Sequence, residues 1–226
     1  MRRRELVGGA VAWPVAARAQ PTERMRRIGV LVGLAENDPE MKQRLAGFRE
    51  GLEKLGWSEG RNVRIDYRFA PAGAQVHLLA RELVALQPDV ILAQSTPATA
   101  ALKPQTSTIP IVFAGVADPI GSGFVASLSQ PGGNLTGFMQ YEEGITGKWL
   151  AMLKEVAPNL TRAALLANPK TAAFDYFLRP AKTQAPSLAI EVVPIPIENA
   201  NDIERSVEGF AANRMAGWFY RRTPRP

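Results

Sequence analysis

The chain has 226 residues, 46% of them hydrophobic, no cysteine and a formal net charge of +6, which is enough material for one large domain or one and a half smaller ones. The lack of cysteine excludes disulfides, thiolate metal sites and a cysteine nucleophile. Without residues 1–20 and 214–226 the chain carries 19 basic and 20 acidic residues, so its body is nearly neutral and we expect no nucleic-acid partner.

Residues 1–19 have the pattern of an export signal. Arg2 to Arg4 form a positive start, a short and weakly apolar stretch follows, and Ala17-Arg18-Ala19 fits the small-x-small cleavage pattern. Residues 3–7 also fit a twin-arginine signal. We therefore predict export to the periplasm with cleavage near Ala19, although a disordered basic tail would have a similar composition. No stretch approaches the 20 or so apolar residues of a membrane span, so none is expected.

The first half alternates predicted strands and helices. Residues 27–32 are continuously apolar, which is typical of a parallel strand covered on both faces. Asp38 precedes Pro39 and Glu40, a favourable start for a helix over 39–55. The other elements expected here are strands at 62–69, 89–93, 109–114 and 135–139 and helices at 74–86, 98–102 and 123–128. The strand at 62–69 alternates apolar and polar residues, which places it near a sheet edge.

The pattern restarts after residue 140. Helices are expected at 145–156, 174–184 and 202–212, and strands at 162–167 and 189–195. This alternation predicts an α/β fold with parallel sheets: a Rossmann-like first lobe over 26–140 and an incomplete second α/β lobe over 141–213. Residues 214–226 end in WFYRRTPRP where another strand is required, so we interpret them as an atypical tail produced by a frameshift or an early stop.

Ligands in open parallel sheets bind outside the carboxyl ends of the strands. The turn at 94–99 follows a predicted strand, and its hydroxyls precede a proline at the first helical position. We predict Ser95, Thr96 and Ala98 as ligand-binding residues, with Ser95 or Thr96 also capping the helix. Capping alone would explain the same hydroxyls. The turn at 33–37 is a second candidate wall, or a plain loop.

Three further residues are candidates for the same site. Asp118 follows the fourth strand and would accept a hydrogen bond from a ligand amine, or else cap the next helix or hold its own loop. Tyr141 would stack on a ligand or pack at the hinge between lobes. Asn168 would face the ligand from the second lobe or form a turn with the next residue. His77, the single histidine, is expected on the polar side of a helix, so we expect no metal site and no cofactor.

Two other classes of function fit part of the sequence. Residues 121–126 match the G-x-G-x-x-A form of a dinucleotide fingerprint, but they lie several residues after their strand instead of in the first strand–helix turn. A nicotinamide-dinucleotide-binding enzyme is therefore one alternative. A periplasmic ligand-sensor domain is the other, because the same type of fold serves effector binding.

Several well-spaced stretches resemble the substrate-binding proteins of ABC transporters with the type I periplasmic-binding fold. They are RRREL, AWPVAARAQ, GFREGLEKLGWSEGRNVRIDYRFA, PDVILAQSTPATAALK and TIPIVFAGVADPIGSGFVASLSQPGGNLTGF. The resemblance implies two α/β lobes, a small-molecule solute bound in the cleft between them, and a closed form that docks on an ABC permease in the inner membrane. It implies binding without catalysis, and we expect an amino-acid-like or carboxylate solute. Members of this family are longer, so most of the second lobe would be missing.

Overall fold

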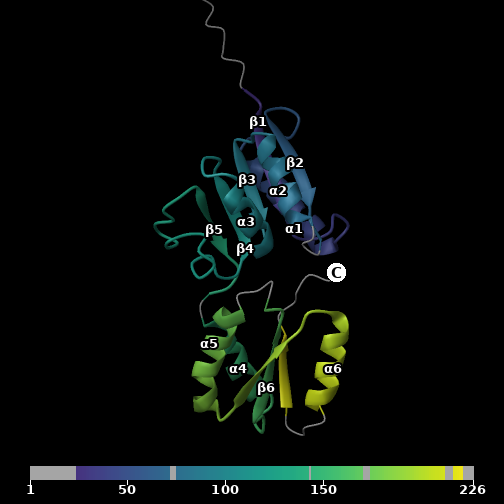
Figure 1. The fold of residues 1–226 in the computed structure, drawn as a ribbon, viewed down its shortest axis with the longest axis vertical. Helices are drawn as coiled ribbons and strands as arrows, with labels where there is room; N and C mark the ends of the chain where they lie inside the picture. Colours follow the sequence, from purple (N-terminus) through teal and green to yellow (C-terminus); the bar gives the residue numbers. More distant parts are fainter. Residues whose placement is uncertain (1–23, 72–74, 143, 170–173, 212–215, 221–226) are drawn as a thin grey trace, which may run out of the picture.

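The computed structural model describes residues 24–71, 75–142, 144–169, 174–211 and 216–220. Figure 1 shows two lobes one above the other, each with its own parallel sheet. The predicted export signal at 1–19 lies outside the described residues. None of the described helices combines the length and the apolar character needed to cross a membrane.

The sheet of the first lobe has five parallel strands in the order β2-β1-β3-β4-β5. The strands are β1 (Arg26–Val32), β2 (Val63–Phe69), β3 (Val90–Gln94), β4 (Ile111–Val116) and β5 (Leu135–Met139). The alternating strand is β2, and its edge position is confirmed. Val30 and Leu31 point to opposite faces of β1 and both are fully buried, as the continuous apolar run predicts.

Helices cover both faces of this sheet. Helix α1 (Pro39–Lys54) packs Met41 and Leu45 against one face, and the Asp38 carboxylate caps it as predicted, accepting from the backbone N–H groups of Glu40 and Met41. Helices α2 (Val76–Ala85) and α3 (Thr96–Leu102) pack on the other face, and the 3-10 turn η1 (Lys103–Gln105) follows α3. The first lobe is therefore a three-layer α/β/α unit.

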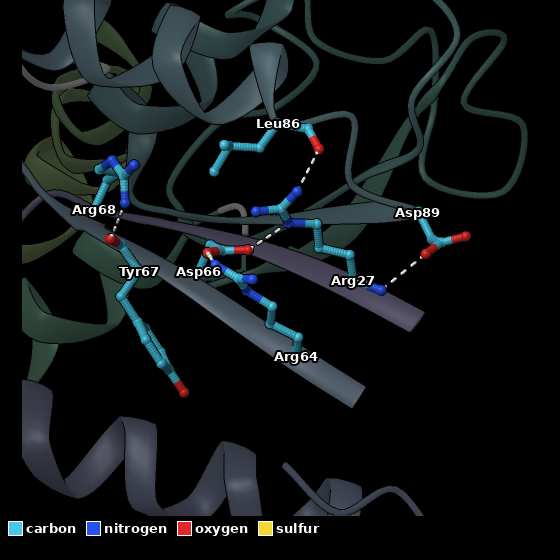
Figure 2. Close-up of polar contacts among 7 residues, drawn as sticks. All are labelled: Arg27, Arg64, Asp66, Tyr67, Arg68, Leu86 and Asp89. Carbon is cyan, nitrogen blue, oxygen red and sulfur yellow. Dashed lines mark hydrogen bonds and ion pairs between the residues drawn. The ribbon is translucent and has the colours of Figure 1, made fainter. Parts of the chain in front are cut away.

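One arginine near the amino end of β1 connects three neighbouring strands, as Figure 2 shows. Arg27 on β1 donates through Nε to the Asp66 carboxylate on β2 at 2.6 Å and through NH1 to the Leu86 carbonyl at 2.9 Å. Its backbone N–H donates to the carboxylate of Asp89, just before β3, at 2.8 Å. These contacts lower the pKa of Asp66, mainly through its hydrogen bond from Arg27, and that of Asp89, mainly through the Arg27 backbone N–H.

The second lobe has a three-stranded parallel sheet in the order β7-β6-β8. Its elements are α4 (Ile145–Val156), β6 (Arg162–Ala167), α5 (Phe174–Gln184), the 3-10 turn η2 (Ala185–Leu188), β7 (Glu191–Pro196), α6 (Ala200–Ala211) and β8 (Ala216–Tyr220). Leu150 of α4 and Phe177 of α5 form a core with one face of β6, and Phe210 of α6 packs on the other face. Figure 1 shows α4 and α5 on the opposite side of this sheet from α6.

Two sequence predictions about elements are wrong. Residues 123–128 form turns instead of a helix, because Gly123 has φ +68 and Ser127 bonds locally to the backbone of Gln130. Residues 216–220, assigned to the atypical tail, form strand β8 and pair with β6. The rest of that tail, 214–215 and 221–226, lies outside the described residues.

Candidate functional site

The strand order of the first sheet indicates that a ligand binds at the carboxyl ends of its strands. From β1 the chain moves to β2 on one side and then to β3 on the other, so the connections diverge at the carboxyl ends of β1 and β3. Such a switch point leaves a crevice in open α/β sheets. Here the two chain segments are in close contact: Gly33 N–H donates to the Gln94 carbonyl at 3.2 Å, and a Cβ on Gly33 would lie 2.3 Å from Ser95 Oγ.

Ser95 is held at this edge in an unusual backbone conformation. Its φ of 99° and ψ of 158° fall in a region that is nearly restricted to glycine and costs a non-glycine residue on the order of 1–3 kcal/mol. Its N–H donates to the Ala114 carbonyl at 2.9 Å, and its Oγ accepts from the Ala98 N–H at 3.4 Å. The structure therefore assigns the predicted helix cap to Ser95. Strain of this kind is concentrated at ligand-binding sites.

The neighbours of Ser95 in the predicted site take different roles. Thr96, the first residue of α3, is partly buried beside it. The Ala98 methyl group is fully buried in the core of the first lobe, so only its backbone could contact a solute. Thr99, which sequence reasoning did not single out, is also fully buried and donates through Oγ1 to the Ser95 carbonyl at 2.9 Å. Thr99 thereby supports Ser95 from within the helix.

The carboxyl end of the first sheet faces the second lobe. Ala117 follows β4 directly and is fully buried in the hydrophobic cluster of the second lobe. Tyr141 packs edge-on against Trp149 and Phe177, with ring centroids 5.6 and 5.8 Å away, and its carbonyl accepts from the Tyr176 hydroxyl at 3.1 Å. The observed contacts of Tyr141 are those of the hinge-packing alternative.

The remaining two predicted residues lie at carboxyl ends as expected, but in different lobes. Asp118 follows β4 and accepts from the Gly121 N–H at 2.7 Å, so at least one of its oxygens holds its own loop. Asn168 follows β6, the middle strand of the second sheet, and is partly buried. The structure thus brings Ser95 and Thr96 together and leaves Tyr141 and Asn168 on the second lobe.

Three residues at the carboxyl ends of these strands were not predicted as site residues. Gln94 ends the otherwise apolar strand β3, and that polar ending was the available sequence signal. Gly115 has φ +71 and lies where the register of β4 shifts against β5, the mark of a β-bulge. Arg44 extends toward Gly115 from the second turn of α1. No sequence pattern predicts that these two residues lie near each other.

Two surface hollows lie away from this edge. One of about 470 Å³ is bordered mainly by residues 103–109, next to the amino end of β4. The other, of about 590 Å³, lies between α4 and α5 and is lined by Gly147, Lys148 and Arg179 among others. The glycines at 121 and 123 lie in a series of turns, without the helix that a dinucleotide fingerprint requires. These observations give the nicotinamide alternative no structural support.

Comparison with known proteins identifies relatives of both the sequence and the fold. The family model described as "ABC transporter substrate binding protein" matches residues 27–221. A "Tyrosine-binding protein" of Clostridioides difficile (strain R20291) is 31% identical over 148 residues, which are 65% of this chain and 42% of that protein. A conserved domain protein of Vibrio cholerae O1 biovar eltor superposes with a TM-score of 0.75 at 29% identity, over 83% of this chain and 62% of that one.

A third relative shows the fold alone. The structure of an ABC domain from Streptococcus pneumonia in complex with L-Trp superposes with a TM-score of 0.78 at 23% identity, over 87% of this chain and 65% of that one. The chain therefore spans less than two thirds of the length of each of these relatives. The family model covers most of the chain, and the predicted α/β fold of the periplasmic-binding type is confirmed. The chain belongs to the family of ABC transporter substrate-binding proteins.

Proposed function

We propose that this protein is the solute-binding component of an ABC transporter, and that it binds an amino-acid-like or carboxylate solute between its two lobes. The observation that carries the proposal is the switch point of the first sheet. Gly33 and the strained Ser95 meet there, at an edge that faces the second lobe. Ser95 and Thr96 supply hydroxyls from the first lobe, and Asn168 supplies an amide from the second.

The proposed mechanism is reversible binding without covalent chemistry. A solute that contacts both walls favours the closed arrangement of the lobes, and an ABC permease in the inner membrane recognises that arrangement. The export signal at 1–19 would place the protein in the periplasm. The 31% identical relative named as tyrosine-binding supports a solute of the amino-acid class.

Calorimetric titration tests the solute class. The chain starting at Gln20 is titrated with L-tyrosine, L-leucine, benzoate and D-glucose. We expect saturable heat with at least one of the three carboxylates and none with the sugar. Heat from glucose alone would overturn the proposed class of solute.

A matched pair of variants locates the binding wall. Thr96→Val removes the hydroxyl beside Ser95, whereas Thr108→Val removes an exposed hydroxyl just before β4, at the opposite edge of the same sheet. We expect Thr96→Val to weaken binding about 5–20-fold, the effect of one lost hydrogen bond, and Thr108→Val to leave it unchanged. Equal affinities for both variants would place the solute elsewhere.

A further inference from the structure

Among the described residues, part of one face of the first sheet has no covering helix. The buried cluster below α1 contains side chains of β1 and β2, with Leu92 of β3 at its margin, and it includes none from β4 or β5, every residue of which is described. Val112 of β4 lies beside Leu92, and Thr136 of β5 lies beside Val112, so these side chains share that face. Phe138, two residues further along β5, also points to it and is 76% exposed. Because parallel sheets are typically buried on both faces, the bare face formed by Val112, Thr136 and Phe138 is open to a partner.

Strand β5 also has a free edge along its length. It has β4 on one side and no strand on the other within the described sheet. The Asn134 carbonyl and the Gln140 N–H both bond to β4. The alternation of a strand therefore directs the backbone groups of Leu135, Gly137 and Met139 away from β4. In the described part of the chain no hydrogen bond reaches these outward groups, so they are available to a further strand.

Two other edge strands carry residues that oppose such pairing, whereas β5 carries none. Strand β2, at the opposite edge of the first sheet, contains Arg64, Asp66 and Arg68. Strand β7, at an edge of the second sheet, contains Pro194 and Pro196. Strand β5 has the sequence LTGFM, without a charge or a proline. Because charged residues and prolines protect edge strands from pairing with another chain, their absence from β5 indicates a strand that has a partner.

A second copy of the chain fits this edge without bringing like charges together. If two β5 strands pair antiparallel about Gly137, Thr136 lies opposite Phe138 of the second copy. The two Phe138 rings then become diagonal neighbours on the bare face, within reach of each other. The same pairing of two β2 strands about their central residue would place Asp66 opposite Asp66 of the second copy, which is destabilising. The charge pattern therefore favours self-association through β5 and opposes it through β2.

We propose that the protein forms a two-fold symmetric dimer in which the β5 edge and the bare face of one copy meet those of a second copy. The two first-lobe sheets then join into one continuous sheet, and Gly137 of each copy exchanges backbone hydrogen bonds with Gly137 of the other. The contact covers the exposed Phe138 rings. It uses the side of the sheet and not the carboxyl ends of its strands, so it goes beyond the proposed function and does not depend on which solute is bound.

Sedimentation velocity over a range of concentrations tests the dimer, with the chain starting at Gln20. Phe138→Lys places two like charges at the centre of the contact. Leu55→Lys is the matched control, because Leu55 is 77% exposed at the end of α1, on the same lobe. We expect the unaltered chain and the control to dimerise equally, and Phe138→Lys to weaken dimerisation at least about 10-fold. A monomer at every concentration, growth beyond the dimer, or a dimer that Phe138→Lys leaves intact would overturn the proposal.

Disulfide formation tests the register of the two strands. The chain has no cysteine, so each introduced thiol can react only with another introduced thiol. Residues 136 and 138 of opposite copies would have Cα atoms about 4.5 Å apart, within reach of a disulfide, whereas identical positions would be about 7–8 Å apart. We expect an equal mixture of Thr136→Cys and Phe138→Cys to give a covalent dimer on mild oxidation, and either variant alone to give little. No covalent dimer from the mixture, or equal yields from each variant alone, would overturn the pairing through β5.

Discussion

The two lobes repeat one arrangement of three strands. In the first lobe β1 lies between β2 and β3, and in the second lobe β6 lies between β7 and β8, in the same chain order. Each middle strand also carries an arginine near its amino end that pairs with an acid on the next strand. Arg27 meets Asp66 at 2.6 Å, and Arg162 meets Glu191 at 3.1 Å.

The difference between these pairs is burial. The Asp66 side chain is 12% exposed, whereas the Glu191 side chain is 66% exposed. Arg27 also donates to the Leu86 carbonyl, while Arg162 lies over the ring of Phe210 at 5.0 Å. The arginine–acid pair therefore connects three strands in the first lobe, whereas in the second lobe it is a surface ion pair. Both lobes have this arginine–acid pair, but the contribution of each pair to stability depends on how deeply it is buried.

The prediction with the largest expected effect is that the two lobes unfold separately. Phe113 is fully buried in the first lobe and Phe177 is 1% exposed in the second, so truncation of either to alanine should cost about 3–5 kcal/mol. We expect Phe177→Ala to remove hydrogen-exchange protection from β6 and α4 while β1 and β3 stay protected, measured by mass spectrometry. Phe113→Ala should do the reverse. Loss of protection in both lobes from either change would show a single cooperative unit.

The ion pairs give the next largest effect. Asp66→Asn leaves the partly buried Arg27 guanidinium without its charged partner, and we expect a loss of about 1–3 kcal/mol in urea unfolding. Glu191→Gln is the matched change on the second lobe and should cost no more than about 0.5 kcal/mol, because that pair is screened by solvent. Equal losses would mean that burial does not separate the two pairs.

Acidification should weaken the first lobe through the pKa values of two of its carboxylates. The pKa values of Asp66 and Asp89 are lowered in the folded protein, so the unfolded chain binds more protons as the pH falls through the ordinary aspartate range. Their stabilising contribution is complete above that range, which begins near pH 4, and is lost on further acidification.

Thermal melts between pH 7 and pH 3 measure this loss. Asp66→Asn should flatten the acid side of the profile for the first lobe, because one of the two lowered carboxyls is gone. If Asp66→Asn left the profile unchanged, the contact between Arg27 and Asp66 would not contribute to the pH dependence of stability in acid.

The sequence predicts the fold where local signals and burial agree. Asp38 followed by Pro39 sets the start of α1, and the alternation in β2 sets its edge position, because both depend on neighbours along the chain. The turns at 123–128 escape prediction because the apolar residues there suit a helix, while Gly123 adopts a left-handed conformation. The pairing of β8 with β6 is a contact over about fifty residues, which composition near the chain end does not reveal.

The candidate site is also only partly predictable from the sequence. Ser95 is predictable because a hydroxyl before Pro97 at a strand end is a local pattern. The proximity of Gln94, Arg44 and Gly115 is not, because it depends on a bulge in β4 and on the packing of α1 against the sheet. Sequence reasoning therefore finds the capped turn at the carboxyl end of β3 and misses the approach of Arg44 to Gln94 and Gly115 beside it.

The smallest effect concerns Ser95 itself and tests whether the first lobe stores strain for binding. Ser95→Gly relieves a backbone conformation that costs on the order of 1–3 kcal/mol. It also loses a few tenths of a kcal/mol of helix capping and adds about 0.5–1 kcal/mol of chain entropy to the unfolded state. The net result should be a gain of about 1 kcal/mol in urea unfolding, whereas Ser95→Ala, which keeps the strain and loses the cap, should lose about 1 kcal/mol.

The order of these two variants matters more than their size. If Ser95 only capped α3, glycine and alanine would both destabilise the protein, with alanine the worse by a small margin. A stabilising Ser95→Gly that also weakens L-tyrosine binding would show that the strained backbone serves the solute and not the fold. A destabilising Ser95→Gly would mean that the hydrogen bond from the Ala98 N–H to Ser95 Oγ outweighs the strain, and that the conformation of Ser95 serves the fold.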